Sequence, residues 1–407
     1  MVSAGGLTAG LVGAPGAAAG ASARRGVPAV RHGSGSPFTV CAIAATTGAF
    51  VELGTYDVIG AKAWVKDVNR HGGLLGHKVS LVVENDSSDP ATAASLVRKC
   101  VEQVHANVIF GPEETSTAAA AIPVAVELHE LLIGWQSGWT GQGIPTPDLT
   151  SYAFPVQANI FFADDLATVQ NLIVPRHYTR VAVVQDNAPG GLGNSAYTAS
   201  LGKRYHFKVV ATQTLAPGAT DDTPAALALL KANPQIVVLG VIPGPDTITI
   251  IKAIRAQNPN IPISECSGCA LPSFVQAVGA KAMHNVYLIG TPSDILKLAR
   301  TKVNLPAIKA TASYIAAMRS TGYGSTDDVD QSGEGYAAGV ELQVAAQAAR
   351  SLSTSALLKG MRHETLVTGG LQAYYWHRTP SDYANITRIV AAMDTISPSG
   401  KPVVVAG

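Results

Sequence analysis

The chain carries almost no net charge, which argues against one broad class of function. Its 29 lysines and arginines nearly balance 28 aspartates and glutamates, so the formal net charge is +1. Lysine and arginine form no cluster, and the sequence therefore shows no electrostatic footprint for nucleic acid. No apolar run approaches the roughly 20 residues that a membrane-spanning helix needs. We expect no nucleic-acid partner.

The sequence also lacks the short motifs of several enzyme classes. It contains no G-x-S-x-G, H-E-x-x-H or Walker A motif. Gly191-x-Gly193-x-x-Ala196 matches a relaxed dinucleotide fingerprint, but the acidic ribose ligand expected about 20 residues later is missing. Asp327-Asp328-x-Asp330 lacks the glycine and glutamate spacing of a calcium loop and is interpreted as a solvated turn and helix cap. We expect no enzymatic activity, no cofactor and no metal.

Cysteine is scarce, with four residues in the chain. Cys266-x-x-Cys269 has no second ligand pair for zinc and does not occupy the usual place of a redox motif. A local disulfide between these two cysteines in an exported protein is the favoured interpretation, and two buried thiols are the alternative. Cys41 falls in an expected strand and Cys100 in an expected helix, so both are interpreted as core residues.

The size and composition indicate a packed, two-domain protein. A chain of 407 residues exceeds one ordinary core. Its 47% hydrophobic and 14% charged residues are typical of a well-packed globular protein. Residues 1–36 are rich in glycine and alanine and are expected to be a flexible tail or the remnant of a signal peptide. Ala21-Ser22-Ala23 resembles a cleavage site, although the basic segment of a signal peptide is missing.

Two successive β/α series are predicted by hydrophobic periodicity and by turn residues. Expected strands at 38–44, 79–83, 108–110 and 131–133 alternate with helices, which is the pattern of a doubly wound parallel sheet. A hinge strand at 152–155 precedes the second series, whose strands are expected at 181–185, 208–213, 236–241, 261–263 and 286–290. Residues 306–362 are expected to be mostly helical, and antiparallel strands are expected within 371–405.

The stretch from Val108 to Trp139 organises the first series. Thr115 and Ser116 stand where a helix begins after one strand, and Gln136 to Trp139 follow the next strand. Open α/β sheets bind ligands outside the carboxyl ends of their strands. The free N–H groups of a helix start, beside these hydroxyls, suit an anionic or carbonyl oxygen. The alternative is that the hydroxyls only cap the helix.

Two carboxylates lie beside this expected oxygen site. Glu113 and Glu114 could select against anionic ligands, bind an amine, or simply favour the helix N-terminus electrostatically. The last is the commonest reason for acids at such a position.

Five local motifs, in a consistent order, resemble one family of binding proteins. They are Thr47-Gly48, Asn69-x-x-Gly72-Gly73-x-x-Gly76, Asp86 followed by Asp89-Pro90, the Gly111 turn with Thr115-Ser116, and Gly335-Tyr336-Ala337-Ala338. Together with the β/α layout, they resemble the type I periplasmic binding proteins of the leucine/isoleucine/valine-binding branch over residues 37–405. The resemblance implies an α/β fold of two Rossmann-like lobes, joined by three crossover strands near Phe154, Ile289 and Tyr374, with a ligand cleft between the lobes. Lobe 1 would comprise 37–155 plus about 290–372, and lobe 2 would comprise 156–289 plus about 373–407.

The resemblance also implies which residues bind a ligand. A hydroxyl matching Thr115 and the loop matching Gln136 to Trp139 would hold a carboxylate. The second lobe departs from the family pattern, because Pro189-Gly190-Gly191 replaces a tyrosine and Ser267 stands where a glutamate would bind an ammonium group, with Glu265 two residues away. The indole of Trp139 and the ring of Phe50 could form a flat apolar wall, although loop packing is an equal alternative for Trp139. The candidate ligand-binding residues are Thr115, Ser116, Gln136, Ser137, Gly138, Trp139, Phe50, Gly191, Pro243, Glu265 and Ser267.

The predicted function is solute capture outside the cytoplasm for an ABC-type importer. The expected ligand is a small molecule with a carboxylate, such as a branched-chain or aromatic amino acid or a related acid, enclosed by hinge closure. The expected partners are this ligand and a membrane permease, and the protein is expected to be a monomer. Its expected location is periplasmic or extracellular, with lipid or membrane association left open. A ligand-sensing regulatory protein of the same fold is the alternative, and a nucleotide-dependent enzyme using the Gly191 loop is the least favoured.

Overall fold

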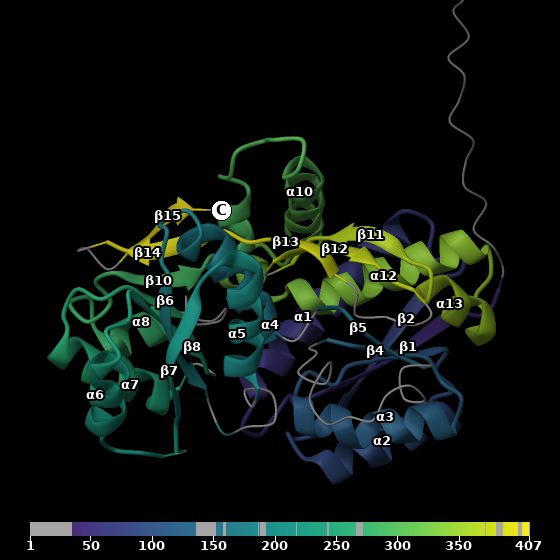
Figure 1. Cartoon of the computed structure of the whole chain (residues 1–407). Coiled ribbons are helices and arrows are strands. Elements are labelled where there is room, and N and C mark those ends of the chain that lie inside the picture. Colours follow the sequence, from purple (N-terminus) through teal and green to yellow (C-terminus); the bar gives the residue numbers. More distant parts are fainter. Residues whose placement is uncertain are drawn as a thin grey trace, which may run out of the picture. The chain divides into compact units, whose positions relative to one another are not determined.

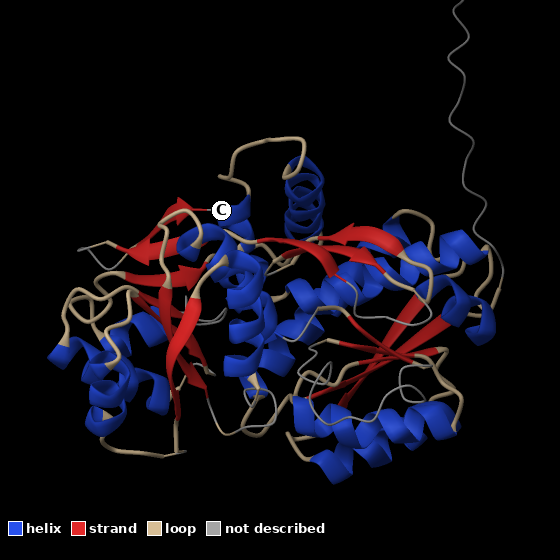
Figure 2. Ribbon diagram, in the orientation of Figure 1, coloured by secondary structure: helices blue, strands red, loops and turns tan. Residues whose placement is uncertain are grey.

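The computed structural model describes residues 35–135, 152–157, 160–185, 187, 193–216, 218–241, 244–265, 272–370, 372–379, 386–397 and 401–406. Helices and strands alternate along most of the chain. The strands form two separate, mainly parallel sheets, and helices cover each of them (Figures 1 and 2). The predicted fold class, an α/β protein with two lobes, is therefore confirmed. Within the described residues, no helix combines the length and the apolar character needed to cross a membrane.

The first sheet has five strands in the order β2-β1-β3-β4-β5, and every neighbouring pair is parallel. Its side chains are buried on both faces, as expected where helices cover a parallel sheet on both sides. Since all five strands run the same way, their carboxyl ends meet at one edge. The strands are β1 (Phe38–Ala44), β2 (Val79–Asn85), β3 (Val108–Phe110), β4 (Leu132–Gly134) and β5 (Ala153–Pro155).

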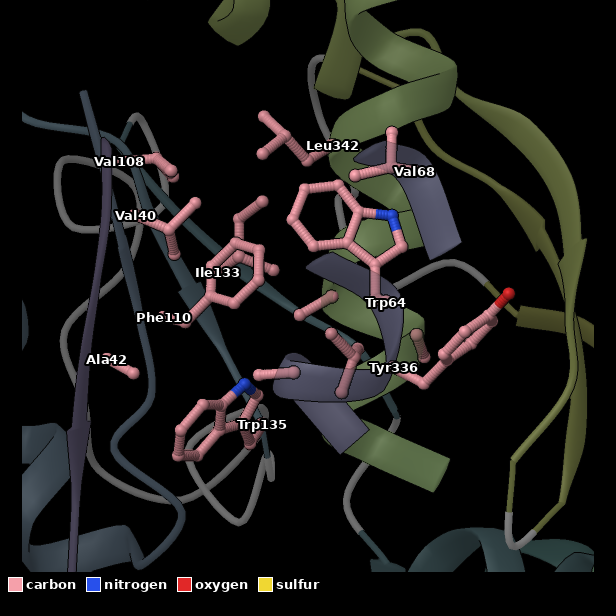
Figure 3. Close-up of a cluster of buried hydrophobic side chains, with 14 of the residues drawn as sticks. Val40, Ala42, Trp64, Val68, Val108, Phe110, Ile133, Trp135, Tyr336 and Leu342 are labelled. Atoms are coloured by element: carbon pink, nitrogen blue, oxygen red, sulfur yellow. The ribbon is translucent and has the colours of Figure 1, made fainter. Parts of the chain in front are cut away.

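Helices from two distant parts of the chain cover this sheet. One face packs against α2 (Pro90–Glu102) and α3 (Thr115–Glu127). The other packs against α1 (Val51–Arg70), α10 (Leu305–Ser320), α12 (Gly333–Ala349) and α13 (Thr354–Met361), with the short helix α11 (Thr326–Gln331) beside them. Figure 3 shows Trp64 of α1 beside Phe110 of the sheet, with Leu342 of α12 close to it in the same cluster. The Trp64 and Phe110 ring centroids are 5.8 Å apart.

Helices α1 and α12 approach each other so closely that glycine is required between them. A Cβ atom at Gly335 would overlap the Asp57 carbonyl, and one at Gly60 would overlap the Ser332 carbonyl. Glycine allows the two backbones to meet because it has no side chain. The Gly335-Tyr336-Ala337-Ala338 motif therefore serves helix packing in the first lobe, and the Tyr336 ring also contacts Tyr314 of α10.

A disulfide bond joins β1 to α2. Cys41 and Cys100 are both fully buried, and their Cα atoms are 5.9 Å apart. The interpretation of these two cysteines as plain core residues is therefore wrong. Both belong to the apolar cluster between the sheet and the α2–α3 layer, so burial and covalent pairing occur together. Cys266 and Cys269, for which a disulfide was expected, lie outside the described residues.

The second sheet has seven strands in the order β15-β14-β10-β9-β8-β6-β7. The five strands β10, β9, β8, β6 and β7 are mutually parallel. Strand β14 pairs antiparallel with β10, and β15 pairs antiparallel with β14, so β15 again runs in the direction of the other five. The parallel strands are β6 (Arg180–Gln185), β7 (Lys208–Thr214), β8 (Ile236–Gly240), β9 (Ile263–Glu265) and β10 (Val286–Ile289), and the others are β14 (Met393–Ile396) and β15 (Pro402–Ala406).

Two apolar clusters cover the faces of this sheet. One includes side chains of α6 (Thr223–Lys231), α7 (Pro245–Gln257) and α8 (Pro272–Val278). The other includes side chains of α4 (Ile160–Thr168), of the π-helix Val169–Ile173 and of α5 (Asn194–Tyr205). The second β/α series predicted from the sequence is thus confirmed, with β9 two residues later than expected.

A third, antiparallel sheet has the order β11-β12-β13, with strands β11 (Thr365–Thr368), β12 (Ala373–His377) and β13 (Ile386–Val390). Tyr374 and Trp376 of β12 belong to a core cluster of the second sheet. Ala373 of β12 instead packs with α10 and with the short helix α9 (Pro292–Ile295). The antiparallel strands expected near the C-terminus are confirmed, whereas β11, α9 and α11 were not predicted. The exact lobe boundaries and the three crossovers remain predictions.

One buried guanidinium connects three distant segments. Arg378, directly after β12, is fully buried and donates to the Pro155 carbonyl at the end of β5. It also donates to Glu341 of α12 at 2.9 Å and to Glu364, before β11, at 3.2 Å. The guanidinium lies 4.3 Å from the centroid of the Trp376 ring. Burial raises the pKa of both glutamates, and the Arg378 charge opposes that rise.

The disulfide gives a direct test of stability. Cys41 and Cys100 are separated by 59 residues. A loop of this length constrains the unfolded chain enough for the bond to contribute about 2–4 kcal/mol. We expect the Cys41→Ala/Cys100→Ala variant to lose stability of this order in urea unfolding. A Cys266→Ser/Cys269→Ser variant is the comparison, and an unchanged midpoint for the first variant would contradict the structural role of the bond.

Candidate ligand-binding site

The loops at the carboxyl edge of the first sheet are tied together by side chains. Asn85, the last residue of β2, accepts from the Thr46 and Thr47 amides at 3.0 and 3.2 Å and donates to the Thr47 hydroxyl at 2.8 Å. Gly48 has a φ of +97°, and a Cβ atom there would overlap the Ser87 carbonyl. The Thr47-Gly48 motif therefore fixes the loop after β1 against the loop after β2.

Glu114 caps helix α3, which corrects the expectation of free amides at this helix start. Its Oε2 accepts from the Ser116 amide at 2.6 Å and from the Thr117 amide at 3.1 Å. The Ser116 hydroxyl donates to the same oxygen. The side chains of Thr115 and Ser116 are not the cap, so the alternative interpretation of these hydroxyls is wrong as well. The Glu114 carboxylate therefore occupies the position at which the sequence predicted a ligand oxygen.

The role of Thr115 in ligand binding remains a prediction. Its side chain is half-buried, and within the described part of the chain its hydroxyl makes no hydrogen bond. Ser116 is exposed, and its hydroxyl is used by Glu114. Phe50 is half-buried at the start of α1, where its amide donates to the Ser88 hydroxyl at 3.0 Å. Thr115 and Phe50 thus lie at the starts of two helices that follow strands at the same edge of the sheet.

The other candidate residues cannot be placed in this geometry. Glu265 ends β9, at the carboxyl edge of the second sheet, but its side chain is outside the described residues. The same is true of the whole of Gln136, Ser137, Gly138, Trp139, Gly191, Pro243 and Ser267. Their assignment to the site remains a prediction.

Glu113, which the sequence analysis placed beside the expected oxygen site but did not include among the ligand-binding residues, is buried. Its side chain is 2% exposed, and its Oε1 accepts from the Ala45 amide at the end of β1 at 3.1 Å. Its Oε2 has no hydrogen-bond partner in the described part of the chain. Burial, followed by the nearby charge of Asp86, raises the pKa of Glu113 from 4.5 to about 8. Burial also raises the pKa of Asp86 and of Asp57 on α1.

The second sheet also places polar groups at its carboxyl edge. Gln185, which ends β6, accepts from the Ser195 amide at 3.1 Å. Asn194 is fully buried, and a Cβ atom at Gly240 of β8 would overlap its amide group. Gly193 has a φ of +91° and begins α5, so this part of the apparent dinucleotide fingerprint serves the start of a helix.

The described residues hold no group of three or more His, Cys, Asp or Glu side chains that could bind a metal ion. The acidic run 327–330 lies in α11, which Ser325 caps by accepting from the Asp328 amide at 3.0 Å. Asp330 is 7% exposed and accepts from the Ser293 hydroxyl at 2.8 Å. The interpretation of this run as a solvated turn and helix cap agrees with the exposed Asp327 but is wrong for Asp330, which the helix turns inward.

Comparison with known proteins identifies relatives of the same architecture. A family model described as periplasmic binding protein matches residues 37–392. The Leu/Ile/Val-binding protein of Escherichia coli (strain K12) is 24% identical over 274 residues, which cover 67% of this chain and 72% of that protein.

Solved structures agree with this result. An extracellular ligand-binding receptor from Rhodopseudomonas palustris HaA2 aligns with a TM-score of 0.72 at 17% identity, covering 91% of this chain and 99% of that one. A branched-chain amino acid transporter substrate-binding protein from Streptococcus pneumoniae, solved with isoleucine, aligns with a TM-score of 0.62 at 19% identity, covering 88% and 99% of the two chains.

The raised pKa of Glu113 predicts a pH-dependent stability. As the pH rises from 4.5 to about 8, the unfolded chain loses this proton while the folded chain retains it, so Glu113 lowers stability with rising pH. For one such group, the free energy of unfolding falls by about 1.4 kcal/mol per pH unit. Burial also raises the pKa of Glu130, but only to about 7. In urea unfolding between pH 7 and 8, Glu113→Gln should flatten the fall in the free energy of unfolding more than Glu130→Gln does, because Glu130 loses most of its proton at lower pH. Identical slopes for Glu113→Gln and wild type would contradict the assignment.

Proposed function

Because this chain belongs to the periplasmic binding protein family, we propose that it captures a small amino acid or a related solute for an ABC importer. The match spans residues 37–392, which is well over half of the chain. This family consists of solute-binding proteins rather than enzymes, in agreement with the sequence-based expectation. The general function is thus solute binding, and the identity of the solute is the part proposed.

The arrangement of the first sheet is the observation that best supports this proposal. Thr115 at the start of α3 and Phe50 at the start of α1 follow β3 and β1, whose carboxyl ends share one edge of the sheet. Ligands of open α/β sheets bind outside such edges. The second sheet ends in a comparable edge with Gln185 and Asn194, so two lobes could close on one molecule by hinge motion.

The relatives favour an amino acid as the solute. The Escherichia coli relative is named for binding leucine, isoleucine and valine, and the Streptococcus pneumoniae structure contains isoleucine. The half-buried Thr115 hydroxyl, which has no hydrogen bond to the described residues, is the proposed polar contact to the ligand carboxylate. Its neighbours in the proposed contact are the loop residues Gln136 to Trp139.

Export is supported by the disulfide. Cys41 and Cys100 are joined by a bond buried in the first lobe. Disulfides of this structural kind form and persist in oxidising compartments such as the periplasm and the extracellular space. We therefore propose that the protein works outside the cytoplasm, where it delivers its solute to a membrane permease.

A thermal-shift screen tests the proposed function. The panel comprises the branched-chain and aromatic amino acids, their amides, their deaminated acids, the basic amino acids and small diamines. A true ligand at 100 times its dissociation constant adds about 2.7 kcal/mol of stability, which should raise the melting temperature measurably. A panel in which no compound shifts the melting temperature would contradict an amino-acid receptor.

Thr115→Val tests the proposed polar contact. Loss of a hydrogen bond to a charged group costs about 1.5–3 kcal/mol, so affinity for a ligand identified in the screen should fall roughly ten- to hundredfold in calorimetry. The melting temperature of the free protein should stay nearly constant, since the hydroxyl has no hydrogen bond within the described protein. Thr92→Val is the matched control, because the Thr92 hydroxyl bonds Asp89 at 2.6 Å on another helix. Unchanged affinity in Thr115→Val would remove Thr115 from the site.

A further inference from the structure

We propose that Glu113 binds a protonated amine of the ligand, so that the first lobe selects amines and rejects acids that carry no amine. This inference rests on the proposed function, because it names the charged group that the same site recognises. Three observations support it: the position of Glu113 in the fold, a Glu113 carboxyl oxygen without a hydrogen-bond partner, and the capping of helix α3 by Glu114.

Glu113 lies where three loops of the proposed site converge. It follows β3, its Oε1 accepts from the Ala45 amide after β1 at 3.1 Å, and the charge of Asp86 after β2 acts on it. All three positions stand at the carboxyl edge of the first sheet. Thr115 begins its helix two residues later. A ligand group held by Glu113 would therefore lie beside the Thr115 hydroxyl and the loop that leads to Phe50.

One carboxyl oxygen of Glu113 is buried and has no hydrogen-bond partner in the described part of the chain. The side chain is 2% exposed, yet within the described residues its Oε2 has no hydrogen-bond partner. The same holds for Oδ2 of Asp86, whose side chain is fully buried. Buried carboxyl oxygens normally have partners, because leaving one unsatisfied costs about 1–3 kcal/mol or more. An ammonium group has three donors and no acceptor, so it can supply the donor that Oε2 of Glu113 lacks.

The amides of the same helix start are already used. The Ser116 and Thr117 amides, which would otherwise attract a carboxylate, donate to Glu114. A ligand carboxylate at the Thr115 hydroxyl would therefore lie next to the Glu114 side chain without these two amides to hold it. An ammonium group on the same ligand, held by Glu113, offsets this unfavourable approach of two acidic groups.

Binding of an ammonium group should release a proton. Burial raises the pKa of Glu113 to about 8, so at pH 7 its carboxyl group is mostly protonated. The charged groups acting on it from the neighbouring segments are Asp86, Glu114 and Asp57, all of them acidic. A bound ammonium group stabilises the carboxylate form, and the carboxyl proton then passes to the buffer. Affinity for an amine should accordingly rise between pH 6 and pH 8.

A series of matched compounds tests the inference. Leucine carries both charged groups, leucinamide lacks the carboxylate, and 4-methylpentanoate lacks the amine. Calorimetry at pH 7, in phosphate and in Tris, measures affinity and proton release for each. We expect leucinamide, which keeps the amine but loses the charged contact to Thr115, to bind within about a hundredfold of leucine and with proton release. We expect 4-methylpentanoate to bind more weakly than leucinamide and without proton release. If the screen finds a better ligand than leucine, that compound with its amide and its deaminated acid replaces the series.

Glu113→Gln and Glu130→Gln form a matched pair of variants. Glu130 is also buried, but it precedes β4 at the amino end of the sheet, away from the proposed site. Glu113→Gln should weaken the amine ligands at least about tenfold and abolish proton release, while Glu130→Gln should change neither. Glutamine retains an acceptor for the Ala45 amide, and the melting temperature of the free variant checks that it folds.

The outcomes separate the inference from the proposed function. If an acid without an amine binds as tightly as its amino acid, or if Glu113→Gln binds amines normally, the inference is overturned and the receptor function stands. If Glu113→Gln does not fold, the wild type alone tests the inference. Equal affinity for an acid and its amino acid, or binding of the amine ligands without proton release, overturns it. If no compound in the whole panel binds, the proposed function fails and the inference falls with it.

Discussion

The pairing of one buried arginine with two glutamates is the interaction on which the architecture most depends. Arg378 reaches Glu341 of α12, Glu364 before β11 and the Pro155 carbonyl at the end of β5, all without exposure to solvent. A charge buried in this way is strongly destabilising unless its partners are in place. The network therefore requires that the end of the first sheet, the late helices and the three-stranded sheet come together, although Pro155 precedes Arg378 by 223 residues in the chain.

Much of the fold could be predicted because its information is local. Apolar runs broken by turn residues indicate β1, β3, β6 and β8, and a proline after an aspartate marks the start of α2. The short elements α9, α11 and β11 were missed, since four to six residues carry too little periodicity. The Cys41–Cys100 bond was missed for another reason: it depends on which face of β1 meets α2, and spacing along the chain does not show this.

The site was predicted less completely than the fold. The sequence placed Thr115 and Phe50 at the carboxyl edge of the first sheet, where the structure also has them, because strand ends and helix starts are local features. It could not assign different roles to Glu113 and Glu114. Adjacent residues point in different directions, so that one becomes the cap of α3 and the other becomes buried against Ala45. Glutamate is also an uncommon choice for the N-cap position, which serine, threonine, aspartate and asparagine dominate.

The glycine contact between α1 and α12 has a consequence for how the chain is made. Helix α1 ends at Arg70, whereas the helix that packs on it begins at Gly333. A ribosome adding about 5–20 residues per second would leave the apolar surface around Trp64 uncovered for tens of seconds. During that interval the first β/α units cannot complete their core. The nascent protein should therefore depend on chaperones, or on a delay in folding, until its last hundred residues emerge.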